Sequence, residues 1–271
     1  MSKRINHLFK DNKKKLVTFV TGGDPDFKTS NNILETIIKN GADIIEIGMP
    51  FSDPMADGPT IQLSSNRAIN QGANLNTIFN QCKKIRIKNK NIPIILMGYY
   101  NVILHYGIKK FITNCSSFGI DGLIIVDLQP EEDSELYNLM KLKDIDLIRL
   151  ITPNTTTSRL KTITSHASGF LYYVTITGIT GQKSADMKEL KQSVKNIKKF
   201  SKLPIVAGFG IKNRLHVKEI CKITDGVVVG SSIVKLIEKN LNKKNNILKA
   251  ISAFVKDLKK GTNLWIGLQI L

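Results

Sequence analysis

Residues 16–21, Leu-Val-Thr-Phe-Val-Thr, form a short run of apolar and β-branched side chains. The segment after them, residues 32–39, carries apolar side chains at helical spacing. Seven more runs of the first kind lie at residues 43–47, 94–97, 122–126, 147–151, 170–174, 205–207 and 226–229. These runs are apolar almost throughout, which is the pattern of parallel strands that are buried on both faces.

The segments between the runs have a period near 3.6. Residues 75–87, for example, place Leu75, Ile78 and Cys82 on one helical face, and residues 108–117, 131–140, 156–165, 187–200, 215–221 and 232–241 behave similarly. Eight strand–helix units predict an α/β protein with a (β/α)8 TIM barrel, and a doubly wound open sheet is the alternative. We expect a single barrel domain over residues 1–271, with an extra N-terminal helix at 3–10 and an extra C-terminal helix at 246–258.

The composition places the chain among ordinary globular proteins. Hydrophobic residues make up 42% of the 271 residues and charged residues 23%, which excludes a disordered chain or a fibrous repeat. No apolar run approaches the roughly 20 residues that cross a bilayer. No signal peptide follows the basic N-terminus, so we expect a cytoplasmic protein without a membrane segment.

The net charge of +18 raises the possibility of a nucleic-acid partner. The lysine pairs, however, are spread along the whole chain, and no aromatic residues alternate with them as a base-stacking surface requires. A solvated lysine-rich surface is the favoured interpretation, and we expect no nucleic-acid partner. Cys82, Cys115 and Cys221 have no metal-binding spacing and the four histidines do not cluster, so we expect core or surface thiols and no metal.

Glu46 interrupts the second apolar run. In a barrel strand it alternates with Ile45 and Ile47, so we expect it to point into the mouth of the barrel, where the active sites of this fold lie. Burial raises the pKa of a carboxyl group, which suits proton transfer near neutral pH. Glu46 is therefore a candidate acid/base, and a buried structural ion pair is the alternative.

Asp57 lies in the loop after this run. The loop contains Pro50, Pro54 and Pro59, so it is stiff for its length and presents a carboxylate rigidly. Asp57 is therefore a second candidate. The alternative is that it caps the helix that is expected over residues 60–70.

Glycine-rich turns follow the last three runs, at residues 178–181, 208–210 and 230. Glycines let backbone N–H groups approach an anion, and the loops after strands 7 and 8 are the recurring phosphate site of this barrel class. A phosphate site is predicted here, with tight turns that bind nothing as the alternative. The polar loop at 175–186 is predicted to be a mobile lid, or else an ordinary surface loop.

Two kinds of chemistry are not expected. No lysine lies in or at the end of a predicted strand, which argues against a Schiff-base aldolase. No Gly-x-Gly-x-x-Gly motif opens a helix after the first strand, which argues against a Rossmann cofactor site.

Residues 46–62 closely resemble the signature of the tryptophan synthase alpha chain family. Residues 19–25, 178–181, 208–211 and 230–231 resemble the other motifs of that family in order and spacing, so the resemblance covers about residues 3–258. It implies a lyase of tryptophan biosynthesis that cleaves indole-3-glycerol phosphate to indole and glyceraldehyde 3-phosphate. The implied reaction is a retro-aldol cleavage that needs no metal or organic cofactor.

The resemblance also implies residue roles. Glu46 is implied as the general acid/base, in part protonated, and ionised Asp57 as the acceptor for the indole N–H. The implied phosphate-binding residues are Gly181, Gly210, Gly230 and Ser231, and the implied apolar wall around indole is Phe19, Ile61 and Phe209. Tyr172 is expected near Glu46 or the glycerol hydroxyls, and Thr180 is expected to bond Asp57 when the lid closes.

The implied partner is a pyridoxal-phosphate beta chain, in an α2β2 heterotetramer whose beta chains contact residues 50–58 and 99–101. The high net charge, Thr177 in the lid and the apolar tail at 263–271 depart from the family pattern. The residues leave three other functions open. These are another phosphate-binding barrel enzyme, such as an isomerase or the synthase that makes the substrate, a scaffolding subunit, and a nucleic-acid-binding protein.

Overall fold

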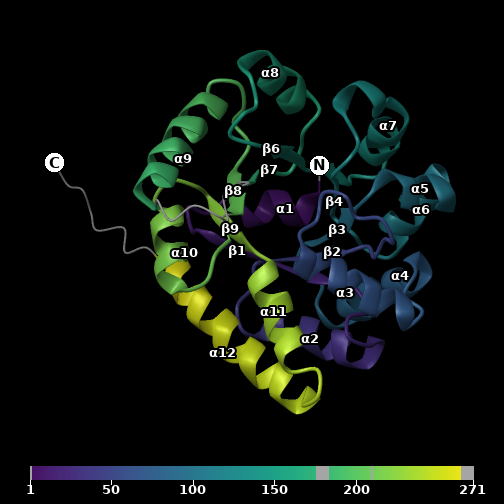
Figure 1. Cartoon of the computed structure of the whole chain (residues 1–271). Helices are drawn as coiled ribbons and strands as arrows, with labels where there is room; N and C mark the ends of the chain where they lie inside the picture. Colours follow the sequence, from purple (N-terminus) through teal and green to yellow (C-terminus); the bar gives the residue numbers. More distant parts are fainter. Residues whose placement is uncertain (1, 175–182, 209, 264–271) are drawn as a thin grey trace.

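Parallel strands form a ring at the centre of the molecule (Figure 1). The computed structural model describes residues 2–174, 183–208 and 210–263. Its strands are β1 (Lys15–Thr21), β2 (Ile44–Gly48), β3 (Ile94–Gly98), β4 (Gly122–Ile125), β5 (Asp146–Leu147), β6 (Arg149–Ile151), β7 (Leu171–Val174), β8 (Ile205–Gly208) and β9 (Gly226–Val229). They lie in the order β5-β4-β3-β2-β1-β9-β8-β7-β6, and every pair is parallel.

The nine strands occupy eight positions. β5 pairs with β4, β6 pairs with β7, and only Ile148 separates β5 from β6 along the chain. The backbone N–H of Ile148 donates to the carbonyl of Leu123 at 2.9 Å, so the fifth position continues through the break. The predicted (β/α)8 barrel is confirmed, and the doubly wound open sheet is excluded.

Helices surround the ring, as Figure 1 shows. They are α1 (Lys3–Leu8), α2 (Phe27–Lys39), α3 (Pro59–Asn70), α4 (Leu75–Lys88), α5 (Tyr100–Tyr106), α6 (Ile108–Ser117), the 3-10 turn η1 (Pro130–Glu132), α7 (Ser134–Leu142), α8 (Thr157–Ser165), α9 (Lys183–Ile197), α10 (Arg214–Cys221), α11 (Ser231–Lys239) and α12 (Lys244–Thr262). The two expected extra helices are α1 and α12, whereas α5 was not expected. Within the described residues, no helix is long and apolar enough to span a membrane.

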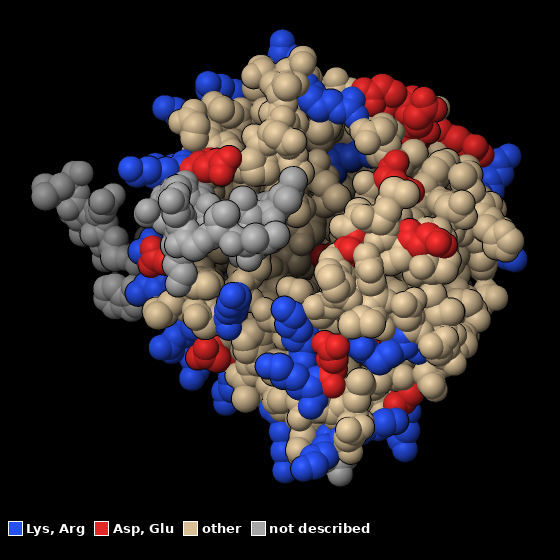
Figure 2. Space-filling model, in the orientation of Figure 1, with Lys and Arg blue, Asp and Glu red and all other residues tan. Residues whose placement is uncertain are grey.

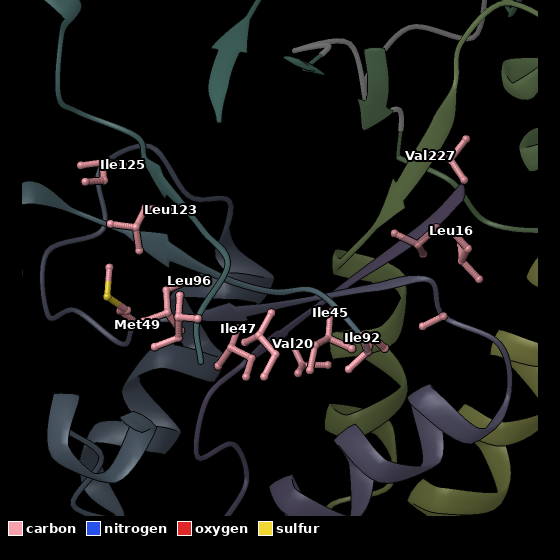
Figure 3. Packing of buried hydrophobic residues seen from close by; sticks show 14 of the residues in the cluster. Leu16, Val20, Ile45, Ile47, Met49, Ile92, Leu96, Leu123, Ile125 and Val227 are labelled. Carbon is pink, nitrogen blue, oxygen red and sulfur yellow. The ribbon is translucent and has the colours of Figure 1, made fainter. Parts of the chain in front are cut away.

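Alternate residues of each strand face opposite sides. One buried cluster lies between the strands and the surrounding helices and includes Ile45 and Ile47 of β2 (Figure 3). A second, smaller cluster fills the inside of the barrel and includes Ile44 of the same strand. Glu46 lies two residues after Ile44, so its side chain shares the inward face. Burial on both faces explains why the strands read as continuous apolar runs.

Helix α1 closes one end of the barrel. Its Ile5 belongs to the inner cluster, and the Phe9 ring lies 5.8 Å from the ring of Phe170 in the same cluster. The start of β1 is at this end too. The expectation that no strand contains lysine is wrong at Lys15, the first residue of β1, which pairs with Asp11. Because Lys15 starts its strand, it lies at the opposite end from the strand carboxyl ends and takes no place in the site.

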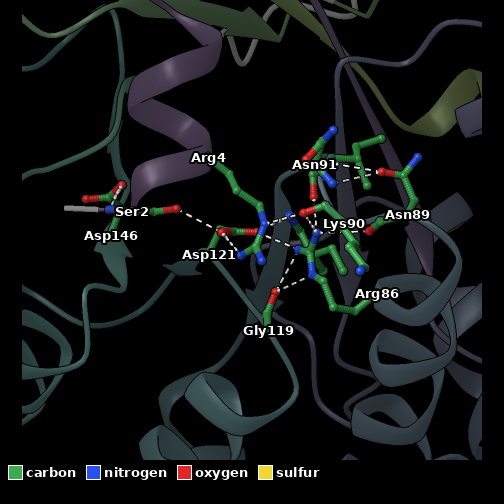
Figure 4. A network of polar contacts seen from close by, with 11 residues as sticks. Ser2, Arg4, Arg86, Asn89, Lys90, Asn91, Gly119, Asp121 and Asp146 are labelled. Carbon is green, nitrogen blue, oxygen red and sulfur yellow. Dashed lines mark hydrogen bonds and ion pairs between the residues drawn. The ribbon is translucent and has the colours of Figure 1, made fainter.

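A polar network fastens α1 to the barrel (Figure 4). The buried Asp121 carboxylate accepts from Ser2 Oγ at 2.8 Å, Arg4 at 3.0 Å, Arg86 at 2.8 Å and the backbone N–H of Ile94 at 2.9 Å. A buried carboxylate is tolerated when several donors satisfy it in this way. Helix α1 and this network therefore close the inside of the barrel at the amino ends of the strands.

Candidate active site

Glu46 is fully buried on the inward face of β2. It pairs in register with Phe19 of β1 and Ile95 of β3, and its side chain has 0% exposure. Burial first, and then the nearby charge of Asp57, raise the pKa of Glu46 to about 8. A carboxyl group with this pKa is largely protonated at neutral pH and can both give and take a proton there.

Both carboxyl oxygens of Glu46 lack a hydrogen-bond partner among the described residues. No ion pair of the described chain includes Glu46 either, so the alternative of a structural ion pair finds no support there. A buried polar group without a partner costs free energy, and such groups cluster at functional sites. The burial of Glu46 therefore favours a role toward a ligand.

Asp57 is held by Tyr99, the residue that directly follows strand β3. Its Oδ2 atom accepts from the Tyr99 hydroxyl at 3.0 Å, and that hydroxyl accepts from the backbone N–H of Ala56 at 3.0 Å. The N-cap of α3 is Gly58, without a side-chain cap, so Asp57 does not serve as the helix cap that was the alternative. Burial raises the pKa of Asp57, and the bond from Tyr99 lowers it again in part.

Helix α3 is fixed to the barrel by side-chain contacts of Ser64 and Arg67. Ser64 Oγ donates to the carbonyl of Ile61 at 2.8 Å and shares a hydrogen bond of 2.5 Å with Thr21 Oγ1. Arg67 makes two bonds, at 2.8 and 2.9 Å, to the Asp24 carboxylate. These bonds set the position of α3, and hence of the loop end that carries Asp57.

A pocket opens beside Asp57 at the carboxyl ends of the strands. Its lining consists of Phe19, Thr21, Gly48, Met49, Asp57, Ile61, Ser65, Met97, Gly98, Tyr99 and Val126. Figure 2 shows the face of the molecule hollowed near its centre, with acidic atoms at the edge of the hollow. Three of the predicted site residues, Phe19, Asp57 and Ile61, thus share one pocket, whereas Glu46 is covered and does not line it.

Phe19 connects the parts of the site. A Cβ added at Gly48 would lie 2.7 Å from the Phe19 ring, and one added at Gly230 would lie 3.1 Å from the Phe19 Cβ. Glycine at both positions therefore lets the Phe19 side chain lie between the end of β2 and the start of α11. The pocket, Glu46 and the loop after β9 are neighbours around this one ring.

Tyr172 borders Glu46 from the other side. It lies on the inward face of β7, and burial, followed by the charge of Glu46, raises the pKa of its phenol. A Cβ at Gly208 would lie 2.7 Å from the Tyr172 hydroxyl, so this glycine is required for the close approach. Tyr172 therefore lies between Glu46 and the end of β8, and the substrate contact that the family resemblance implies for it stays a prediction.

The loops after β8 and β9 meet at the start of α11. Gly210 has a φ of +56°, which glycine adopts readily, and Ser232 Oγ donates to the carbonyl of Ile211 at 2.6 Å. Gly230 is the N-cap of α11 and has no side-chain cap. The first N–H groups of a helix have no partner within the helix, so Ser231 and its neighbours present donors to an anion.

Several expectations lie outside the described residues. Thr180, Gly181 and Phe209 fall there, as do Thr177, most of the predicted lid and most of the apolar tail. The end of the expected loop at 175–186 is wrong, because α9 begins at Lys183 and residues 183–186 are helical. Tyr99 was not expected to contact Asp57, and its position directly after the third strand is the only signal that could have indicated it.

The three cysteines lie in the core, which is one of the two placements expected for them. Cys82, Cys115 and Cys221 are buried and unpaired, and burial raises the pKa of the Cys82 thiol to about 12. A thiol with this pKa is a poor nucleophile at neutral pH.

A parallel (β/α)8 barrel with a buried carboxyl group and a pocket at the carboxyl ends of its strands defines an enzyme of the TIM-barrel class. The family model described as "Tryptophan synthase alpha chain" matches residues 5–263. The alpha chain of Petrotoga mobilis is 45% identical, over 94% of this chain and 98% of its own length. The alpha chain of Methanocaldococcus jannaschii is 44% identical, over 91% of this chain and 88% of its own length.

Solved structures agree. The tryptophan synthase alpha subunit of Legionella pneumophila is 33% identical and superposes with a TM-score of 0.89 over 97% of this chain and 98% of its own. A chain of the aminoacrylate-bound tryptophan synthase of M. tuberculosis is 27% identical. It superposes with a TM-score of 0.85 over 96% of this chain and 99% of its own length. The chain belongs to the tryptophan synthase alpha chain family.

Membership of this family gives the reaction. The protein is a lyase of tryptophan biosynthesis that cleaves indole-3-glycerol phosphate to indole and glyceraldehyde 3-phosphate by a retro-aldol reaction. Its partner is a tryptophan synthase beta chain, which uses the indole. The comparisons thus decide for the lyase over an isomerase, the substrate-forming synthase or a subunit that serves only as a scaffold.

Proposed function

We propose that Glu46 is the general acid and base of the cleavage and that Asp57 binds the indole N–H. The observation that carries this proposal is the fully buried carboxyl group of Glu46, which has no partner among the described residues and a pKa of about 8. The only inward-facing carboxyl group of β2 thus has the protonation behaviour that the reaction needs.

The proposed steps are balanced in protons and electrons. Protonated Glu46 gives its proton to C3 of the indole ring, and the ring becomes positively charged. The Glu46 carboxylate then removes the proton of the hydroxyl on the carbon attached to C3. The bond between the two carbons breaks, its electron pair returns to the ring, and indole and the aldehyde group form while Glu46 is again protonated.

Asp57 stabilises the charge that appears in this sequence. When C3 is protonated, the positive charge lies largely on the ring nitrogen, so a carboxylate that accepts the ring N–H stabilises the intermediate more than the substrate. Asp57 lines the pocket, and Tyr99 supports its ionised form. Tyr172 borders Glu46, where it can contact the glycerol hydroxyls, and Thr180 is proposed to bond Asp57 when the loop after β7 closes.

The phosphate is proposed to bind at the start of α11. Gly210, Gly230 and Ser231 would present backbone N–H groups there, together with Gly181, and the helix N-terminus favours a negative charge. Phe19 and Ile61, with Phe209, would form the apolar wall around the indole ring. Phe19 borders both the pocket that Asp57 lines and Gly230 at the start of α11, so the two proposed parts of the site meet at this ring.

The proposed assembly is a heterotetramer of alpha and beta chains. Residues 1–271 are proposed to form one barrel domain. Two such alpha chains are proposed to assemble with two beta chains in the cytoplasm, with residues 50–58 and 99–101 in contact with the beta chain. We propose no nucleic-acid role. On the face that Figure 2 shows, Lys and Arg side chains lie at the left edge and across the lower part, with Asp and Glu side chains among them. No organic cofactor or metal is proposed for the cleavage.

Ser231→Asp tests the phosphate site. A carboxylate at the start of α11 would repel the substrate phosphate and occupy the helix N–H groups, so we expect KM for indole-3-glycerol phosphate to rise at least ~30-fold. Steady-state indole release, measured with saturating beta chain, gives KM and kcat. Ser231→Ala is the matched control and should change KM less than about threefold, because the backbone donors stay in place. An unchanged KM in Ser231→Asp would show that the phosphate binds elsewhere.

A further inference from the structure

Tyr99 lies at the end of β3, and its phenol reaches the loop that carries Asp57. The side chain is 3% exposed. Its hydroxyl oxygen accepts from the Ala56 N–H at 3.0 Å, and its single proton goes to Asp57 Oδ2 at 3.0 Å. Because an ionised carboxylate can only accept, the direction of this bond is fixed.

Both ends of this bridge are anchored. The next residue, Tyr100, donates its backbone N–H to the Asp127 carboxylate in the loop after β4, at 2.8 Å. The Tyr99 ring lies 5.3 Å from the ring of Phe51 in the Asp57 loop. The phenol thus joins the rigid end of a barrel strand to a loop by one aromatic contact and two hydrogen bonds.

We propose that Tyr99 is a positioning residue for the cleavage, which aims the Asp57 carboxylate into the pocket and keeps it ionised. The proposal rests on the proposed role of Asp57 as acceptor for the indole N–H. No other side chain of the described residues donates a hydrogen bond to the Asp57 carboxylate in the structure. Loss of the Tyr99 hydroxyl would leave the carboxylate without this donor, free to turn away from the ring nitrogen.

The proposal predicts a change in the pH dependence. The hydrogen bond from Tyr99 lowers the pKa of Asp57, whereas the charge of Asp57 helps to raise the pKa of Glu46 on β2. The charge of Asp127, in the loop after β4, helps to raise the pKa of Tyr99. Burial raises the pKa of Asp57 and the Tyr99 bond lowers it. Removal of the hydroxyl therefore raises the pKa of Asp57, and the acidic limb of the kcat profile moves to higher pH.

Tyr99→Phe tests this role with the alpha chain in complex with its beta chain. We expect kcat for indole release to fall about tenfold, KM to change less than about twofold, and the acidic limb to move upward by about half a pH unit or more. Tyr106→Phe is the matched control. It removes the hydroxyl of the last residue of α5, which donates to Asn76 at 2.8 Å outside the pocket, and should leave kcat and the profile unchanged.

A double-mutant cycle with Asp57→Asn separates the possible failures. If Tyr99 acts through Asp57, then Tyr99→Phe has no further effect in the Asp57→Asn background. Additive losses, or a loss of kcat with an unmoved acidic limb, would overturn the positioning role. If Asp57→Asn alone keeps the native kcat, the proposed function of Asp57 fails instead. The carboxyl carbon NMR shift of Asp57, titrated in native protein and in Tyr99→Phe, checks the change of pKa without relying on activity.

Discussion

Replacement of Glu46 by glutamine should lower kcat for indole release by at least ~1,000-fold, because two proton transfers depend on this one carboxyl group. The amide keeps the size of the side chain and still donates a hydrogen bond, but it can neither give a proton to C3 nor remove one from the hydroxyl. Steady-state cleavage of indole-3-glycerol phosphate, with saturating beta chain, measures the effect.

The matched control is Glu35→Gln. It makes the same chemical change on the outside of α2, where Glu35 pairs with Lys88, and should leave kcat unchanged. Native activity in Glu46→Gln would refute the assignment of the acid/base.

The same variant should be more stable than the native protein, increasingly so as the pH rises. The pKa of Glu46 is about 8 in the folded chain, against an ordinary value of 4.5. Well below pH 4.5 the carboxyl group is protonated in both the folded and the unfolded chain, so its ionisation does not change the free energy of unfolding. As the pH rises to 8, the unfolded chain loses the proton and the folded chain keeps it, so native stability falls. Above that pH the loss approaches about 5 kcal/mol.

Urea unfolding at several pH values measures this stability. The free energy of unfolding of Glu46→Gln should exceed that of the native protein by a margin that grows between pH 5 and pH 8. A margin that stays constant over this range would show that Glu46 is not held with a raised pKa.

Asp57→Asn should lower kcat about 100-fold, because a neutral amide cannot stabilise the positive charge that develops on the indole nitrogen. It should also move the basic limb of the pH profile to lower pH. The negative charge of Asp57 contributes to the raised pKa of Glu46, so its removal lets Glu46 lose its proton more easily. The profile of kcat against pH, measured for native and variant complexes, records both effects.

Asp257→Asn is the control for charge alone. Asp257 lies half-exposed on α12, 4.0 Å from Arg214, and its neutralisation should change neither kcat nor the basic limb. An Asp57→Asn variant with native turnover would eliminate the two-carboxylate mechanism.

The fold could be predicted well because each strand is buried on both faces, so apolar runs of five or so residues mark the strands directly. The errors lie where the pattern carries no signal. The break at Ile148 falls within an unbroken apolar sequence, and it depends on pairing with two different neighbours. The start of α9 at Lys183 was placed too late because its first turns carry few apolar residues.

The site was only partly predictable. Glu46 stood out because one carboxylate in an apolar strand is costly unless it has a function. Tyr99 gave no such signal, since a tyrosine after a strand is an ordinary residue and its bond to Asp57 spans 42 positions. Side chains that act through another residue are recognised from the three-dimensional arrangement, whereas a buried charge is visible in the sequence.

The most direct test is a crystal structure of the Glu46→Gln variant with intact indole-3-glycerol phosphate, which the inactive variant should not cleave. We expect the phosphate against the backbone of Gly210, Gly230 and Ser231, and the indole N–H on Asp57. The C3 atom of the ring should lie within about 4 Å of the side chain at position 46. A phosphate bound away from the start of α11, or a ring that lies beyond the reach of position 46, would contradict the account.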